Sequence, residues 1–163
     1  MKIALVDFET RKVATPAGTT HANGEPLKTR WQIFAAGVAI DGEITILYGD
    51  DETKLLAEIG ALLEGATEVG YFATREFDEM VARGRFTNAR RAHAPAPYYP
   101  AIPGAESLPW RNLRRSGERF PERPGTQVAS KDVPAAWKAG RRAEVLDHLR
   151  WDVETLVALR AGR

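Results

Sequence analysis

The chain has 163 residues, of which 44% are apolar and 28% are charged, a composition typical of one globular domain with a substantial core. It contains no cysteine, which excludes disulfides, zinc-thiolate sites and thiol catalysis. No apolar stretch approaches the roughly 20 residues that span a bilayer, and the N-terminus lacks a signal-peptide layout, so we expect a cytoplasmic protein without a membrane partner.

The net charge of +1 conceals an uneven distribution of basic residues. Arg outnumbers Lys by 17 to 6, and nine of the arginines lie in residues 83–123, a segment with only three acids. The guanidinium group is a planar fork of donors that matches phosphate oxygens. This segment is therefore either a solvated loop or a phosphate-binding surface.

The first half of the chain predicts a sheet and one helix, with strands at 2–8, 31–40 and 43–48 and a helix at 53–63. The polar residues 10–30 indicate a long loop. Asp41-Gly42 is a strong signal for a two-residue hairpin turn between the second and third strands. Asp51 or Thr53 is the expected cap of the helix.

The second half alternates strand and helix, with a strand at 68–72 and helices at 75–83, 134–138 and 142–160. Between them, residues 85–124 are rich in proline and arginine, and we expect a long irregular insertion there. This order of elements predicts a single α/β domain over residues 1–163, with a mixed β-sheet flanked by helices.

Two acids stand where the first strand ends. Side chains alternate between faces along a strand, so Asp7 and Glu9 point the same way while Phe8 points to the other face. Two neighbouring carboxylates are costly near a core unless a cation lies between them, and Mg²⁺ prefers such oxygen ligands. The alternative is that the strand has reached solvent and both acids are hydrated.

Two further acids lie on predicted helices. Asp78 follows Phe77 in an early helical turn, where an acid also favours the helix dipole. His148 and Asp152 are four residues apart in the last helix, so they share one helical face. They form either part of a site or an ordinary His–Asp pair on the exposed side.

Taken together, these motifs resemble the DEDD superfamily of 3′–5′ exonucleases, the DnaQ-like branch of the ribonuclease H-like fold. The first motif of that family, Asp-x-Glu on the first strand, is matched by Asp7-Phe8-Glu9 and the following Thr10. The second, Phe-Asp, is matched by Phe77-Asp78, and the third by Asp152 in the final helix. The resemblance spans nearly the whole chain in the order and spacing of its motifs.

Three features depart from the family pattern. The second motif normally carries His-Asn or a similar pair after its glycine, where this chain has Tyr71-Phe72. His148 stands at the spacing expected of a Tyr, four residues before Asp152. The segment 85–124 matches no feature of the family.

The resemblance implies two divalent ions, Mg²⁺ or Mn²⁺, held by four carboxylates: Asp7, Glu9, Asp78 and Asp152. Ions about 4 Å apart in such a site activate a water and stabilise the leaving 3′-oxygen. His148 is the candidate general base, since an unperturbed imidazole pKa of about 6.5 lets it accept a proton near neutrality.

The implied partner is single-stranded nucleic acid, either DNA or RNA. The arginines expected to track its phosphates are Arg83, Arg85, Arg90 and Arg91. Aromatic residues of the same segment that either stack on bases or cover a local core are Tyr98, Tyr99, Trp110 and Phe120.

Three other functions are open at this stage. The first is a nucleic-acid-binding relative that has the fold without catalysis, and the second is an endonuclease on the same fold. The third is an unrelated carboxylate hydrolase such as a glycosidase, which would leave Phe77-Asp78 and Asp152 without a role. Oligomeric state is not predicted by the sequence.

Overall fold

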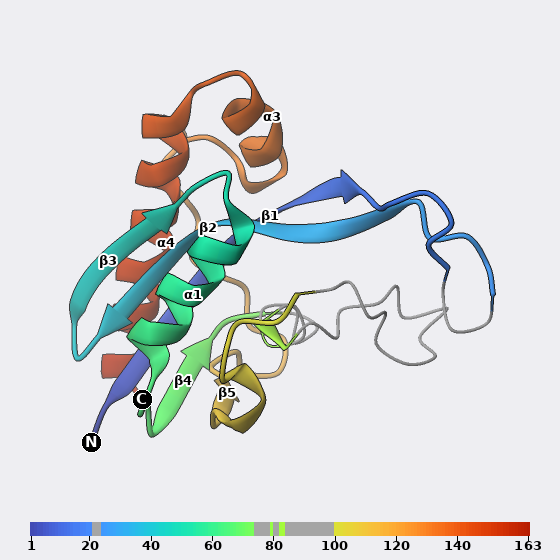
Figure 1. Ribbon diagram of the computed structural model, residues 1–163. Helices are drawn as coiled ribbons and strands as arrows, with labels where there is room; N and C mark the ends of the chain where they lie inside the picture. The colour runs from blue at the N-terminus through green and yellow to red at the C-terminus, as the bar shows by residue number, and fades with distance from the viewer. Residues whose placement is uncertain (21–23, 74–78, 80–81, 84–99) are drawn as a thin grey trace.

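A mixed five-stranded sheet runs through the protein with the strand order β3-β2-β1-β4-β5 (Figure 1). In this computed structural model the described residues are 1–163 apart from 21–23, 74–78, 80–81 and 84–99. The strands are β1 (Ile3–Ala14), β2 (Thr29–Ile40), β3 (Glu43–Tyr48), β4 (Glu68–Tyr71) and β5 (Trp110–Asn112). The helices are α1 (Glu52–Leu63), α3 (Val133–Lys138) and α4 (Arg142–Ala161), with short 3₁₀ turns η1 (Ala105–Ser107) and η2 (Ser130–Asp132).

The sheet combines an antiparallel and a parallel half. Strands β1, β2 and β3 pair antiparallel, whereas β4 and β5 extend the sheet parallel to β1. The predicted turn between β2 and β3 is confirmed, because Asp41 and Gly42 have φ values of 48° and 93°. Such positive φ values at both positions are what a two-residue hairpin turn requires. The predicted α/β class with a mixed sheet is therefore confirmed.

The ribbon formed by β1 and β2 is longer than predicted and extends beyond the rest of the sheet (Figure 1). Its pairing continues to Ala14 and Thr29, so the expected loop over 10–30 was wrong at both ends. These added residues are largely polar, and partners such as Arg11 and Gln32 hydrogen-bond across the ribbon at 2.8 Å. A strand held by ladder bonds and side-chain pairs needs no apolar face, and this is why the hydrophobic pattern missed it.

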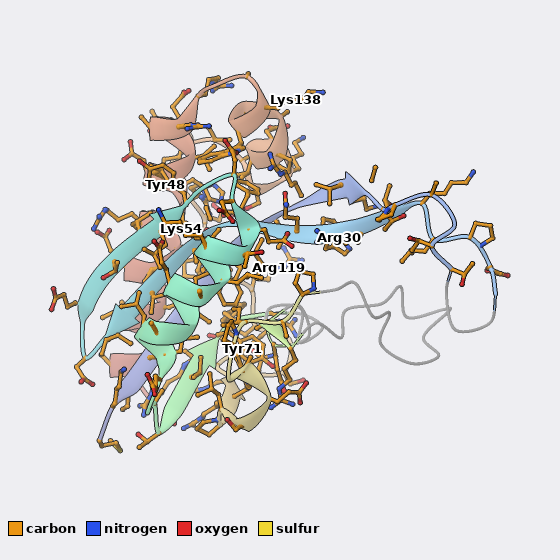
Figure 2. The ribbon with its side chains drawn as sticks, in the orientation of Figure 1. Arg30, Tyr48, Lys54, Tyr71, Arg119 and Lys138 are labelled. Carbon is orange, nitrogen blue, oxygen red and sulfur yellow. The ribbon has the colours of Figure 1, made fainter. Side chains whose placement is uncertain are left out.

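The two faces of the sheet are covered by different helices. Helix α1 packs on the face that carries Phe8, and α4 packs on the face that carries Leu5 (Figure 1). Alternation along β1 therefore separates Phe8 from its neighbours as predicted. Figure 2 labels Arg30 of β2, which binds Glu52 at the start of α1 through two hydrogen bonds of 3.1 and 3.0 Å.

The helices lie close to their predicted positions. Helix α1 is capped by Asp51, whose carboxylate accepts a hydrogen bond from the Lys54 amide at 3.1 Å. Helices α3 and α4 match the predictions for 134–138 and 142–160 within one residue at each end. The predicted helix 75–83 lies largely outside the described residues. Within the described part of the chain, no helix is long and apolar enough to cross a membrane.

Strand β5 lies within the segment that was predicted to be irregular. It pairs with β4 through residues 110–112, and η1 precedes it. The Trp110 ring packs against the Tyr71 ring with a centroid distance of 6.0 Å, and its Nε1–H donates a hydrogen bond to the Ala105 carbonyl at 2.8 Å. Trp110 therefore covers a local core. The expectation of an irregular 85–124 was wrong for these residues, because a three-residue strand is too short to show a pattern.

Candidate functional site

The first strand and the last helix meet at a buried cluster of three ionisable residues. His148 Nε2 of α4 lies 3.2 Å from Glu9 Oε1 of β1 and 3.1 Å from Asp152 Oδ2 one helical turn further on. One ligand-type atom from each of the three residues lies within 4.8 Å of the others. His148 and Asp152 are both buried, so the alternative of an exposed His–Asp pair was wrong.

A glycine lets the helix come this close to the strands. Gly37 of β2 is paired with Asp7 of β1, directly beneath α4. A Cβ added to Gly37 would lie 3.3 Å from Leu149 Cγ and would overlap the side chain of Val153. A larger residue would therefore require Val153 or α4 itself to shift, and α4 carries two members of the cluster.

A β-bulge lies next to Glu9. Glu9 pairs with Ala35 and Thr10 pairs with Ile33, so Phe34 is the extra residue of β2. Its ring turns into the cluster beneath α3 and α4, where it contacts Trp137 at a centroid distance of 4.9 Å. Bulges of this kind re-aim side chains and are frequent beside functional sites.

His148 is a buried histidine with partners at both ring nitrogens. Its side chain is 1% exposed, and its Nδ1–H donates to the Val128 carbonyl at 2.7 Å, which directs Nε2 toward the two carboxylates. Burial lowers the pKa of His148, but the hydrogen bonds and charges of Asp152 and Glu9 outweigh it and raise the pKa to about 9. Burial raises the pKa of the Glu9 carboxyl, and the contact with His148 opposes that rise.

Arg123 supplies a second cation to the cluster. Its Nη2 donates to Asp152 Oδ1, and its guanidinium lies over the Trp151 ring at 5.0 Å. Asp152 is thus held between Arg123 and His148. In this arrangement Glu9 and Asp152 each have a basic partner from the chain itself.

A pocket of about 370 Å³ opens beside this cluster. Its lining combines acids from β1 and α4 with basic and aromatic residues from the segment after β5: Asp7, Asp152, Arg114, Arg119, Arg123 and Phe120. Asp7 and Asp152 therefore face the same pocket, and Glu9 is joined to them through His148. The structure brings four of the predicted site residues together.

The remaining predicted residues have different outcomes. Asp78 lies outside the described residues, as do three of the four predicted nucleic-acid-binding arginines, Arg85, Arg90 and Arg91. Arg83 does not line the pocket; it pairs with Glu79 at 3.0 Å and reaches the Leu108 carbonyl at 3.5 Å.

The pocket arginines were not predicted individually. Arg114, Arg119 and Arg123 belong to the basic segment that the sequence singled out, so a compositional signal was present. No periodic pattern distinguished them from the other arginines of that segment, because they lie in irregular chain after the three-residue strand β5.

The donor set suits a divalent cation in part. Carboxylate oxygens of Glu9 and Asp152 and a nitrogen of His148 are near enough to share one ion, and Asp7 lies in the adjoining pocket. For such an ion to bind, His148 has to lose its proton and act as a ligand, or its side chain has to move away from the two carboxylates. Arg123 likewise competes for Asp152.

Fold and site together define an α/β protein with a buried histidine–carboxylate cluster beside an arginine-lined pocket. Comparison of the chain with protein-family models, with curated proteins and with solved structures finds no match.

Proposed function

We propose that the chain is a divalent-metal-dependent 3′–5′ exonuclease with a ribonuclease H-like fold, which hydrolyses phosphodiester bonds at the 3′ end of single-stranded DNA or RNA. The observation that supports this most is that Asp7 of the first strand and Asp152 of the last helix line one pocket, while Glu9 of the first strand and Asp152 share His148 beside it. The mixed sheet with helices on both faces agrees with the proposed fold.

The metal ligands of this proposal are Asp7, Glu9 and Asp152, together with Asp78. Two bound Mg²⁺ or Mn²⁺ ions would supply an activated water and would stabilise the charge on the leaving oxygen. The chain's own residues hold the ligands in place: His148 orients Glu9 and Asp152, and Arg123 fixes the other oxygen of Asp152. This preorganisation keeps the acids together before substrate binds.

His148 has a different role in the metal-free protein from the one first expected. With a pKa raised to about 9 and both ring nitrogens engaged, it compensates charge and is not a free base at neutral pH. A cation bound to Glu9 and Asp152 removes the negative charge that stabilises the imidazolium, and so lowers the His148 pKa. A general-base role for His148 therefore depends on metal binding.

The test is cleavage of 5′-labelled single-stranded DNA and RNA with and without Mn²⁺. We expect a ladder of shortened products from the wild type and none from Asp7→Ala or Asp152→Asn. Glu154→Gln is the matched control, because Glu154 is an exposed acid on the same helix as Asp152. Circular substrates separate an exonuclease, which leaves them intact, from an endonuclease. Wild-type protein that binds the strand but never shortens it with Mn²⁺ contradicts the proposal.

A second candidate is a nucleic-acid-binding protein without catalysis. One observation favours it: His148 and Arg123 already pair with Glu9 and Asp152, so these two acids have basic partners without a metal ion. Binding of a labelled strand that is unchanged by Mn²⁺, with no product, would support this second candidate.

A further inference from the structure

Three arginines line the pocket that Asp7 and Asp152 also line. Arg114, Arg119 and Arg123 all belong to the stretch that follows β5, and Figure 2 labels Arg119. They are distinct from the arginines at 83–91 that the sequence indicated for nucleic-acid binding. Their position beside the acids makes the pocket basic along one part of its lining and acidic along another.

Much of the donor capacity of these arginines is unused within the described part of the chain. Arg119 is exposed and makes no hydrogen bond or ion pair with any described residue. Arg114 donates through Nε to the Glu118 carbonyl at 2.8 Å, and its two terminal nitrogens have no described acceptor. Arg123 uses Nη2 for Asp152, while its buried Nη1 has no hydrogen-bond partner among the described residues.

Two acids of the pocket lining, Glu118 and Asp152, have basic partners other than Arg114 and Arg119. The Glu118 carboxylate, also in the pocket, accepts hydrogen bonds from the Arg115 amide at 2.8 Å and from the Arg163 guanidinium. Arg163 lies outside the pocket lining, so Glu118 is compensated from elsewhere. Asp152 is already held by Arg123 and His148. No ion pair with a described acid therefore offsets the positive charge of Arg114 or Arg119.

The rest of the lining indicates the kind of anion. Phe72 and Phe120 give the pocket an apolar surface, with their rings 5.1 Å apart and Phe120 packed against Trp151. A bare inorganic anion has no use for such a surface, whereas a nucleotide presents a sugar and a base beside its phosphate. A volume of about 370 Å³ is that of a small-ligand pocket.

We propose that Arg114, Arg119 and Arg123 form a phosphate-binding subsite that holds a backbone phosphate of a single nucleic-acid strand in the pocket beside Asp7 and Asp152. This deepens the proposed function and rests on it, because it names how the same site recognises its substrate. Guanidinium groups bind phosphate oxygens through paired, charge-assisted hydrogen bonds. Arg123 is then shared between Asp152 and the phosphate.

Binding without cleavage tests the subsite. The probe is 5′-fluorescein-labelled pentathymidylate, followed by fluorescence anisotropy in EDTA. We expect Arg119→Ala and Arg114→Ala each to weaken binding about ten-fold, and to reduce the dependence of log affinity on log salt by about one unit. Arg115→Ala is the matched control, because this exposed side chain lies outside the pocket lining and its backbone amide bond to Glu118 is retained.

Several outcomes overturn the subsite. The subsite is overturned if the Arg114 and Arg119 variants bind the probe like the wild type. It is also overturned if Arg115→Ala loses as much affinity as they do, because that result would mean diffuse attraction to a basic surface. Inorganic phosphate is the competitor: we expect it to displace the probe only at far higher concentration than unlabelled pentathymidylate. Equal potency would mean a site for free phosphate and would overturn the nucleic-acid assignment.

A parallel cleavage assay with Mn²⁺ separates this proposal from the proposed function. If the wild type binds, Arg119→Ala does not, and no protein cleaves, the subsite stands and the exonuclease proposal fails. If cleavage requires Asp7 but Arg119→Ala binds and cleaves like the wild type, the subsite fails and the exonuclease proposal stands. Thermal unfolding of Arg119→Ala is expected to match the wild type, because this side chain has no described polar partner.

Discussion

His148 carries a proton that both neighbouring carboxylates stabilise, and this makes the metal-free protein sensitive to pH. Its pKa is about 9 in the folded protein against 6.5 for the ordinary side chain. A group whose pKa is raised by folding stabilises the protein fully below the unfolded pKa and loses that contribution as the pH rises through the folded pKa. We therefore expect the free energy of unfolding to fall by about 3 kcal/mol between pH 6.5 and pH 9.5.

Urea unfolding of the wild type and of His148→Gln in EDTA measures this effect. Gln retains a hydrogen-bonding side chain but has no charge, so the variant should be less stable at pH 6.5 and should lose less stability than the wild type between pH 6.5 and pH 9.5. Equal pH dependence in the two proteins would mean that His148 is neutral in the folded state.

At the same scale, local sequence patterns predicted some residues of the site and not others. Asp7 and Glu9 were found from strand alternation and His148 with Asp152 from helical spacing, because each pair is close in the sequence. Their catalytic and metal-binding roles stay predictions. The contact between Arg123 and Asp152 spans 29 residues and one member lies in irregular chain, so no periodicity pointed to it.

At the scale of elements, the approach of α4 to the sheet depends on Gly37. A Cβ at this position would overlap Val153 and press on Leu149, in a closely packed core. We expect Gly37→Ala to lower the free energy of unfolding by about 1–3 kcal/mol. It should also weaken cleavage more than its effect on stability explains, since α4 carries His148 and Asp152.

Gly49→Ala is the control for this substitution. Gly49 has no heavy atom within 4 Å of a built Cβ, so an alanine there should be neutral. Urea unfolding of both variants checks the difference. Indistinguishable stabilities would show that α4 accommodates the extra methyl group and that Gly37 does not set its position.

Elements with a strong periodic pattern were the ones that the sequence predicted well. The apolar positions of α1 and α4 and the Asp41-Gly42 turn are local signals, and the structure agrees with them. The outer part of the β1–β2 ribbon and β5 depend on a partner strand distant in the chain. The energy of pairing with a distant strand cannot be predicted from the residues of a short segment alone.

At the scale of the whole molecule, the cluster joins the first strand to the last helix, so anything bound there should stabilise the entire fold. Glu9 comes from β1, and Asp152 lies 143 residues later in α4 (residue 152 minus residue 9). If Mn²⁺ binds these acids only in the folded state, it stabilises the protein by about 2.7 kcal/mol at a concentration 100 times Kd. We expect the unfolding temperature to rise with Mn²⁺ accordingly.

The same measurement distinguishes this site from adventitious binding to surface acids. Asp7→Asn should reduce the Mn²⁺-induced rise, because it removes a ligand charge from the pocket, whereas Glu154→Gln should retain it in full. Arg123→Gln should enlarge the rise, since this variant frees an oxygen of Asp152 from its ion pair. A rise of the same size in all four proteins would place the ion elsewhere and remove the metal-dependent mechanism from this cluster.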